Sequence, residues 1–304
     1  MISIISAVHN EIEFNKLFLS SLKKNTSRDY EVIIIDNHST DGSADFFESE
    51  GCTVIRNPVN HCYPESQNIG MQHANGNYFC FLNNDIYLAP EWDIQVIDAM
   101  EKRQLDIASL DSFQTFEDPG ERKKFHHRWR RVRKKTTFLF ANEQELSGMI
   151  DRLYQQNFDL WALDRIKQKS THHFAGINGS AVITSRALWS KLGDNWDEQI
   201  EAADWDLHIR VKQHIERHHD MHPPVIISSA LHHHFAGVTF RKNPEPRNCN
   251  HTHLPLDEKW SQAEIEQFGP HLPEDKSMLH QVRAGIKQLG KMLSGKGNNR
   301  ITGH

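Results

Sequence analysis

The stretch "YFCFLNNDIYLAP", residues 78–90, carries the clearest structural signal in the sequence. A run of apolar residues stops abruptly at Asn83, Asn84 and Asp85, and apolar character then resumes. A short apolar run that ends in this way is typical of a strand buried on both faces of a sheet. The polar triplet is either a turn, since Asn and Asp are common turn residues, or a metal site.

Segments on the N-terminal side of this stretch alternate between two patterns. Short apolar runs rich in β-branched residues predict strands, and apolar residues at helical spacing predict helices. Their alternation favours βαβ units, and therefore an α/β fold with a doubly wound, mostly parallel, Rossmann-like sheet. The predicted strands are 2–7, 30–36, 52–57 and 77–82, and the predicted helices lie near 14–22, 44–50 and 66–74.

Polar side chains follow three of these predicted strands, at the point where each strand ends. They are Asp36, Asn57 and Asp85. In open α/β sheets, ligands bind beyond the carboxyl ends of the strands. Each residue alone fits a turn, but three on one edge of the sheet favour a binding site.

The pattern is less regular on the C-terminal side, and it weakens between about residues 114 and 170. That region predicts a helical insertion. The remaining predicted elements are helices at 92–103 and near 143–154, a strand within 105–113, a strand and helix within 172–193, a helix within 197–215, a strand at 224–235, and a last helix near 276–293.

Composition excludes several classes of protein. The 304 residues carry a net charge of −5, which gives no reason to expect a nucleic-acid partner. No stretch reaches the roughly 18 apolar residues that a membrane helix needs, and the N-terminus lacks the pattern of a signal peptide. The four cysteines show no metal or disulfide spacing. We therefore expect a cytoplasmic protein with reduced cysteines.

One block of sequence is strongly basic. "ERKKFHHRWRRVRKK", residues 121–135, holds nine Lys or Arg in fifteen residues. Such a block is either a solvated face or a surface attracted to an anionic membrane or a diphosphate-lipid acceptor. In the second case Phe125, Trp129 and Phe138 are the predicted interfacial contacts, and the last helix could act in the same way.

Taken together, the segments from about 2 to 239 resemble the family 2 glycosyltransferases, which have the GT-A fold. No single motif decides this resemblance, but their order and spacing support it. The matching segments are "IIIDNHSTDGS" for the family's first acidic loop, "VIRNPVNHCYPESQNIGMQHANGNYFCFLNNDI" for the run that ends in the DXD motif, "INGSAVITSRALW" for the acceptor-side strand, "AADWDLHIR" for the EDxDLxxR segment and "ALHHHFAG" for the closing metal histidine.

The resemblance implies a divalent metal that stabilises the departing diphosphate, with Mn²⁺ or Mg²⁺ as the candidates. Asp85 matches the last residue of the DXD motif, and Asn83 replaces its first aspartate. In the triplet His232–His234, alternation along a strand places His232 and His234 on one face. The family's histidine aligns best with His232, and either of the two is a candidate ligand beside Asp85.

The resemblance also implies residues that bind the nucleotide sugar. Asp36 matches the acidic residue that binds the base or ribose, and its two acceptor oxygens suit that role. Asn68 matches the Asn of the family's RN pair, but Gln67 stands where Arg is usual. The full candidate set is Ala7, Asp36, Asn57, Asn68, Asn83 and Asn84.

For catalysis, Asp204 matches the aspartate that acts as general base on the acceptor hydroxyl. One carboxylate that removes this proton during a single displacement gives inversion at the anomeric carbon. Asp206 is either a supporting catalytic residue or simply an acidic residue at a helix start. Ala203 occupies the position of the family's preceding Glu.

The sequence thus predicts a metal-dependent inverting transferase of a hexosyl or related group, acting in bacterial surface glycan or glycolipid assembly. The donor would be of UDP, dTDP or GDP type, the acceptor a glycan or lipid-linked hydroxyl, and a peripheral contact with the inner face of the membrane would accompany it. The alternative is a non-catalytic nucleotide-sugar-binding protein with a degenerate site, which Gln67, Asn83 and Ala203 favour because each lacks a charge that the family's site carries. A sugar-nucleotide pyrophosphorylase is disfavoured because "SAVHNEIE" holds no Gly-rich phosphate loop.

The expected division of the chain is a transferase domain at 1–245 and a helical extension at 246–304. The transferase domain consists of a nucleotide-sugar half (1–110), a basic insertion (111–170) and an acceptor half (171–245).

Overall fold

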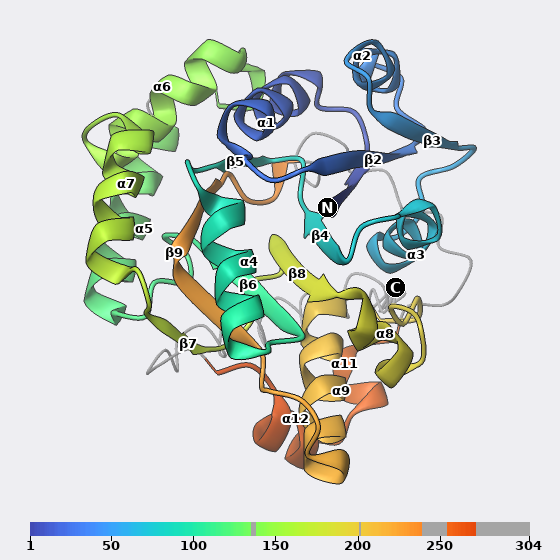
Figure 1. Cartoon of the computed structure of the whole chain (residues 1–304). Coiled ribbons are helices and arrows are strands. Elements are labelled where there is room, and N and C mark those ends of the chain that lie inside the picture. Colours follow the sequence, from blue (N-terminus) through green and yellow to red (C-terminus); the bar gives the residue numbers. More distant parts are fainter. Residues whose placement is uncertain (135–137, 201, 239–253, 272–304) are drawn as a thin grey trace, which may run out of the picture.

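The computed structural model describes residues 1–134, 138–200, 202–238 and 254–271 (Figure 1). These residues build one nine-stranded sheet with helices on both faces. The strands are β1 (Ile2–Val8), β2 (Tyr30–Asn37), β3 (Thr53–Asn57), β4 (Tyr78–Leu82), β5 (Ile86–Leu88), β6 (Ile107–Asp111), β7 (His173–Ala175), β8 (Ala181–Ser185) and β9 (Val225–His234).

The order of the strands confirms the α/β prediction. It runs β3-β2-β1-β4-β8-β6-β9-β5, and β7 pairs with β9. Strands β3, β2, β1 and β4 are parallel, as are β6 and β9, so their carboxyl ends lie along one edge. Strand β8 is antiparallel to both β4 and β6 and joins the two parallel groups. The sheet is therefore mixed and mostly parallel at its N-terminal half.

Two layers of helices cover the sheet. Their bounds are α1 (Ile12–Asn25), α2 (Ser43–Ser49), α3 (Tyr63–His73), α4 (Trp92–Arg103), α5 (Pro119–Lys134), α6 (Glu143–Tyr154), α7 (Phe158–Lys169), α8 (Arg186–Leu192), α9 (Ala203–His218), α11 (Leu256–Lys259) and α12 (Gln262–Phe268), with a 3-10 turn at Phe138–Phe140. None of the helices in the described ranges has the length and apolar character that a membrane-spanning helix needs.

The core forms because β-strand side chains alternate between the two faces of the sheet. In β1, Ile4 packs in the cluster that includes α1 and α4, and Ile5 packs in the cluster that includes α8 and α9. Helix α3 lies very close to the sheet, because a Cβ at Gly70 would stand 2.3 Å from a side-chain carbon of Ile5. This close packing fixes the start of α3 beside the carboxyl ends of β1 and β2.

The insertion is more regular than its sequence suggests, since α5, α6 and α7 form a helical layer with its own aromatic core. Figure 1 shows these helices together on one side of the sheet. The prediction that aromatic residues of this block face a membrane is wrong for Phe125, Trp129 and Phe138, which are only 6%, 4% and 6% exposed. Phe125 and Trp129 are buried because helical spacing turns them to the inner side of α5. Phe138, in the turn after α5, packs on Phe14 and Phe235.

The C-terminal described segment packs against α9. Leu256 and Phe268 bury against Ile200 and Ile209. The amide N–H of Leu254 donates to the carbonyl of Gln199 at 2.7 Å, which ties the segment to the loop before α9. The last helix predicted near 276–293 lies outside the described residues.

Candidate functional site

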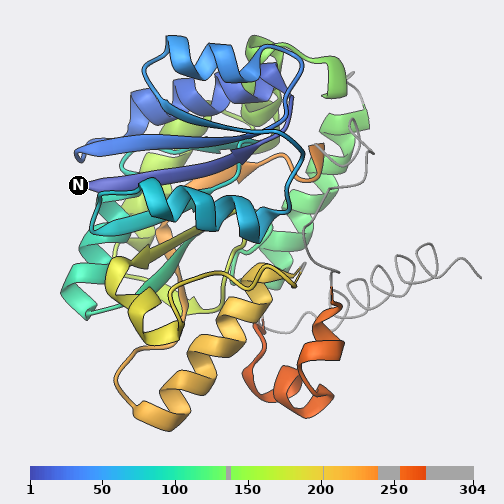
Figure 2. The ribbon, with the colours of Figure 1, turned by 90° about the vertical axis from the view of Figure 1, so that its right-hand side faces the viewer.

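The candidate site lies along the carboxyl edge of the parallel strands, where the register places the predicted residues side by side. The register opposes Ala7 to Ile35 in β1 and β2, and Asn37 to Asn57 in β2 and β3. In Figure 2 strands β1 and β2 run away from the N-terminus toward this edge. Ala7 is half-buried, so backbone at the end of β1 is partly open to solvent.

Asp36 offers an acceptor that no other described residue uses. Its side chain is 3% exposed, and Oδ2 accepts a hydrogen bond from the backbone N–H of Ser39 at 3.2 Å. Oδ1 is buried and has no hydrogen-bond partner among the described residues. Since a buried acceptor without a partner is costly, this atom fits a ligand hydroxyl or ring N–H.

Asn57 belongs to a small polar ladder beside Asp36. Its Nδ2 donates to Oδ1 of Asn37 at 2.8 Å, and Nδ2 of Asn37 donates to Oγ of Ser66 at 3.0 Å. The ladder shapes the floor between β2, β3 and α3. Asn57 is only 8% exposed, so its predicted contact with the donor remains a prediction.

The triplet that ends β4 has three different environments. The backbone N–H of Asn83 donates to the carbonyl of Ser180 at 3.0 Å. Nδ2 of Asn84 donates to Oδ1 of Asn15 in α1 at 2.7 Å. Asp85 turns toward β9, where its carboxylate meets His234. The triplet is thus held by three separate elements, and it leaves one carboxylate at the edge of the sheet.

The pairing of β5 with β9 decides which histidine lies beside Asp85. Ile86 opposes His234, and the N–H of Phe235 donates to the carbonyl of Asp85 at 3.0 Å. As a result Nε2 of His234 lies 3.2 Å from Oδ1 of Asp85. His232 points to the same side, as the alternation predicts, but Leu88 opposes it.

The other two histidines have different surroundings. Nε2 of His232 and Oγ of Ser180 form a hydrogen bond of 2.8 Å, and burial, with the nearby His234 as second cause, lowers the His232 pKa to about 3. His233 points the opposite way and stacks on Phe113 with ring centroids 5.5 Å apart. His232 is therefore neutral at physiological pH and positions Ser180.

The contacts of His234 fit a metal ligand. Nδ1 of His234 lies 2.9 Å from Oε1 of Gln114, and a neutral imidazole that donates there leaves its Nε2 lone pair toward Asp85. Two acceptors that face each other at 3.2 Å need a proton or a cation between them. No group of three or more His, Cys, Asp or Glu that could hold a metal occurs in the described part of the chain. A hard cation held by Asp85, His234 and substrate phosphate oxygens needs no third protein ligand.

Asp204 lies in the first turn of α9, next to the turn at Asn178–Ser180. A Cβ at Gly179 would stand only 2.3 Å from Oδ2 of Asp204, so the absence of a side chain there makes room for the carboxylate. Burial raises the pKa of Asp204, against hydrogen bonds from backbone N–H groups. The buried Tyr63 hydroxyl lies nearby. Its pKa is raised first by burial and then by the charge of Asp204. A carboxylate with a raised pKa is a better proton acceptor near neutral pH.

Asp206 is placed quite differently, although it is only two residues away. Its Oδ1 accepts hydrogen bonds from Nζ of Lys259 at 2.6 Å and from Nε1 of Trp260 at 2.8 Å. The side chain is 1% exposed, and Arg210 lies 3.8 Å from Oδ2. These contacts hold the C-terminal segment on α9, and a catalytic role for Asp206 remains an untested prediction.

Asn68 and Gln67 of α3 have very different surroundings. Asn68 donates to the carbonyl of Trp196 at 3.0 Å and to Glu198 at 2.9 Å, and it accepts from the N–H of Trp196 at 2.8 Å. Its amide therefore anchors the loop that leads to Asp204, and its predicted donor contact stays a prediction. Gln67 is fully buried, and neither of its side-chain polar atoms has a partner among the described residues.

The turn at Asn178–Ser180 and Gln114 are site residues that the sequence reasoning missed. Nδ2 of Asn178 donates to the carbonyl of Leu110 at 2.9 Å, and its Oδ1 accepts from Oγ of Ser180 at 2.8 Å. The "NGS" letters signal a turn, but only the tertiary structure shows that this turn touches Asn83, Asp204 and His232 together. Gln114 carries no sequence signal, because it follows a strand without any motif.

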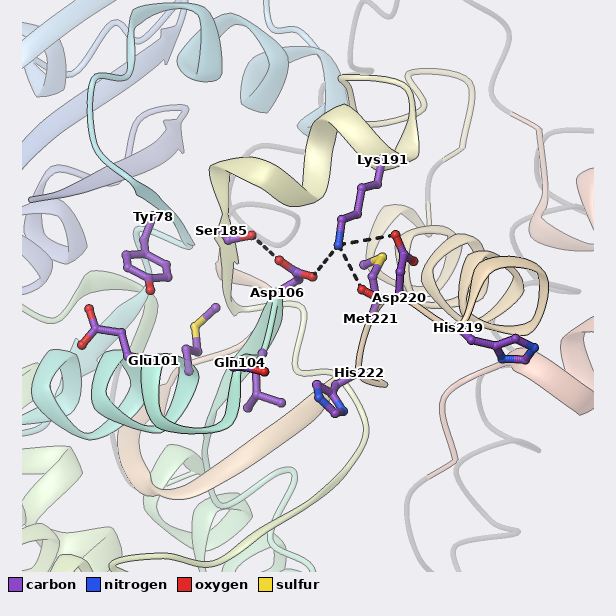
Figure 3. A pocket seen from close by; sticks show the side chains of 12 residues that line it. Tyr78, Glu101, Gln104, Asp106, Ser185, Lys191, His219, Asp220, Met221 and His222 are labelled. Carbon is purple, nitrogen blue, oxygen red and sulfur yellow. Dashed lines mark hydrogen bonds and ion pairs between the residues drawn. The ribbon is translucent and has the colours of Figure 1, made fainter.

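A separate hollow of about 580 Å³ opens at the opposite edge of the sheet (Figure 3). Lys191 lies there between Asp106 and Asp220, at 3.2 Å and 3.7 Å. Tyr78 and Ser185, which line the same hollow, are paired at the start of β4. The hollow is thus at the amino ends of the parallel strands and does not belong to the candidate site.

A polar carboxyl edge on a mostly parallel α/β sheet is the place where open α/β folds bind their ligands. Comparison with known proteins then gives the family. Residues 3–159, more than half of the chain, match the model of glycosyl transferase family 2, so the chain belongs to this family. Its fold is the GT-A fold, and the predicted family assignment is confirmed.

Individual relatives agree with this assignment. An uncharacterized glycosyltransferase of Haemophilus influenzae is 34% identical over 103 residues, which are 34% of this chain and 35% of the relative. The poly(ribitol-phosphate) beta-glucosyltransferase of Bacillus spizizenii is 32% identical over 114 residues, 35% of this chain and 18% of the relative. The matches thus span about a third or less of these relatives. A crystal structure of S. aureus TarS superposes with a TM-score of 0.50 at 14% identity, and the match covers 77% of this chain and 36% of TarS.

Proposed function

We propose that the protein transfers a hexosyl or related group, with inversion, from a nucleotide-diphosphate sugar to an acceptor hydroxyl. The observation that carries the proposal is the turn at Asn178–Ser180. Its Ser180 carbonyl accepts from the N–H of Asn83, and its Gly179 packs against the carboxylate of Asp204. One turn therefore brings together the proposed diphosphate site and the proposed base.

The donor would bind along the carboxyl edge of β1, β2 and β4. The free Oδ1 of Asp36 suits a ribose hydroxyl or a ring N–H of the base. Backbone at Ala7 and the polar groups of Asn57, Asn68, Asn83 and Asn84 complete the proposed donor contacts. The donor would be of UDP, dTDP or GDP type.

Asp85 and His234 would hold Mn²⁺ or Mg²⁺ together with the donor diphosphate. A divalent cation there supplies positive charge that stabilises the leaving diphosphate. His234 takes the place that the family alignment gave to His232, because Nε2 of His234 lies 3.2 Å from Asp85, whereas Nε2 of His232 is hydrogen-bonded to Ser180. Gln114 would orient the imidazole through Nδ1.

Asp204 would act as the general base. As the acceptor oxygen forms its bond to the anomeric carbon, the bond from that carbon to the diphosphate oxygen breaks, and the hydroxyl proton passes to the Asp204 carboxylate. A single displacement of this kind inverts the anomeric centre. The raised pKa of Asp204 supports the assignment, since it makes the carboxylate more basic.

The wider setting is part of the same proposal. We propose a nucleotide-sugar half (1–110), a basic helical insertion (111–170) and an acceptor half (171–245), followed by an extension (246–304). The acceptor would be a glycan or lipid-linked hydroxyl in bacterial surface glycan or glycolipid assembly, with a peripheral contact to the inner face of the membrane. The name of the Bacillus spizizenii relative supports a cell-surface polymer as the setting.

Replacing Asp204 by Asn tests the proposal. The change removes the base and keeps the size of the side chain, so we expect the rate of sugar transfer to fall about 100- to 10,000-fold. Donor binding should remain, which calorimetric titration with the nucleoside diphosphate and Mn²⁺ can show.

Asp194→Asn is the matched control, because Asp194 lies in the loop before α9 and its positive φ of 66° suits Asn. We expect its transfer rate to equal that of the wild type. A normal rate in Asp204→Asn would remove this residue from the mechanism and leave the protein a candidate for the non-catalytic alternative.

A further inference from the structure

Helix α5 (Pro119–Lys134) has two sharply different faces. Its buried residues are Arg122, Phe125, Trp129 and Val132. Its exposed basic and histidine residues are Lys123, Lys124, His127, Arg130, Arg131 and Lys134. At 3.6 residues per turn, the exposed set falls within about a third of the helix circumference, opposite the buried set. The exposed face of α5 is therefore one continuous basic stripe.

The charges of this stripe have no salt-bridge partner among the described residues. Within the described ranges, Lys123, Lys124, Arg130, Arg131 and Lys134 form no salt bridge. The acidic residue of α5, Glu121, forms a salt bridge with Arg165 of α7, in which Oε1 of Glu121 lies 2.8 Å from Nη1 of Arg165. Five cations that stand together in water without carboxylate partners favour an anionic partner.

An exposed aromatic side chain follows the basic stripe in the chain. Phe140 is 85% exposed, while its neighbour Phe138 is 6% exposed and packs against Phe14 and Phe235. The turn that carries Phe138 is thus anchored to the core while Phe140 projects into solvent. An anchored turn with a projecting aromatic ring beside basic residues matches the composition of surfaces that enter the headgroup region of a membrane.

The inner face of α5 connects this surface to the candidate site. Trp129 packs against His233 with ring centroids 4.9 Å apart, and His233 lies between His232 and the proposed metal ligand His234. Phe113, which follows the carboxyl end of β6, also packs against Trp129 at 6.1 Å. Helix α5 therefore packs on β9, on the face opposite His234, and this strand joins the basic stripe to the candidate site.

We propose that the exposed face of α5, together with Phe140, is a docking surface for an anionic lipid membrane. The basic stripe supplies attraction to anionic headgroups, and Phe140 enters the interface. A soluble polyanion would use the charges but would gain nothing from an exposed phenyl ring, which is why a membrane is the partner that fits. The proposal deepens the peripheral contact of the proposed function, but its test needs no sugar transfer.

The test is co-sedimentation of the full chain with vesicles of phosphatidylcholine alone or mixed with phosphatidylglycerol, without any donor. We expect binding to the mixed vesicles only, and weaker binding as salt is raised. The double change Lys124→Gln and Arg131→Gln removes two neighbouring charges of the stripe, and binding should fall on the order of 20-fold. Phe140→Ser should weaken binding about five-fold or more, because a buried ring is lost from the interface.

The matched control is Lys102→Gln with Arg217→Gln, which removes one Lys and one Arg from exposed positions at the ends of α4 and α9. Its binding to the mixed vesicles should equal that of the wild type. Equal losses in both double variants would show that the effect depends on net charge alone, and would overturn the proposal.

The proposal would also fail if inorganic polyphosphate bound as tightly as the vesicles and Phe140→Ser weakened neither binding, because the surface would then be a site for soluble polyanions. If Lys124→Gln with Arg131→Gln loses vesicle binding but keeps its rate of sugar transfer in solution, the stripe serves docking and not catalysis.

Discussion

The two halves of the sheet hold their candidate residues by different means. In the parallel half, β3-β2-β1-β4, the residues stand at strand ends, and the register alone pairs Asn37 with Asn57 and places Asp36 one residue before them. In the mixed half, β8-β6-β9-β5, Asp204 and His234 reach their places through contacts between distant segments, such as Gly179 and Gln114. The first kind of site follows from local sequence, and the second depends on tertiary structure.

Asp204 and Asp206 show a similar difference in their contacts, although both lie in the first turn of α9. Asp204 faces the turn at Asn178–Ser180 and has a pKa raised by burial. Asp206 is held by Lys259 and Trp260. We propose that the Asp204 carboxylate is available for chemistry, whereas the contacts of Asp206 stabilise the fold. Replacing Lys259 tests this difference most strongly.

Replacing Lys259 by Met should lower the free energy of unfolding by about 3 kcal/mol. The substitution leaves Asp206, 1% exposed, without its 2.6 Å cationic partner, although Arg210 remains at 3.8 Å. Urea unfolding measures the loss. Lys102→Met at an exposed position of α4 is the control and should change stability by less than about 0.5 kcal/mol. A loss of transfer in Lys259→Met without a loss of stability would instead place Asp206 in the chemistry.

A smaller effect should appear in the dependence of stability on pH. Asp111, at the end of β6, is fully buried, and burial raises its pKa from 3.8 to about 7, against the nearby Arg165. Because the folded state binds this proton more tightly than the unfolded state, the stabilisation is fully present below pH 3.8 and is lost as pH rises through about 7.

Between pH 3.8 and about 7, each rise of one pH unit should lower the free energy of unfolding by about 1 kcal/mol, and above about pH 7 this group causes no further change. Asp111→Asn cannot titrate, so its urea midpoint should fall less than that of the wild type as the pH rises from 3.8 to about 7. Asp106→Asn, at the opposite edge of the sheet, serves as the control. Parallel pH curves for the wild type and Asp111→Asn would contradict the assignment of this dependence to Asp111.

The fold of the parallel half could be predicted because its β-branched apolar runs can hardly form anything except buried strands. The sequence also predicted that Asp85 lies at a strand end and that His232 and His234 share a face. It could not choose between the two histidines, since that choice depends on the pairing of Ile86 with His234 across residues far apart in the chain. The sequence could not predict that β8 is antiparallel either, because an apolar run does not indicate the direction of a strand in the sheet.

Helix α5 shows the opposite limitation. Its basic letters dominate the sequence, and the aromatic residues among them were predicted to face a membrane. The helical period turns Phe125 and Trp129 inward, and the exposed ring is Phe140, which stands outside the basic block. Composition indicated an interaction surface, but only the structure shows which residues are available to it.

We propose that Asp85 and His234 form the metal and diphosphate site at the carboxyl edge. The most direct measurement is calorimetric titration with UDP, GDP and dTDP, with and without Mn²⁺, of the wild type, Asp85→Ala and His234→Ala, and of His172→Ala as an exposed-histidine control. We expect Mn²⁺-dependent binding of one nucleotide, weakened on the order of 10- to 100-fold in Asp85→Ala and His234→Ala and unchanged in His172→Ala. Binding that ignores Mn²⁺ and both substitutions, or no binding of any nucleotide, would contradict the claim.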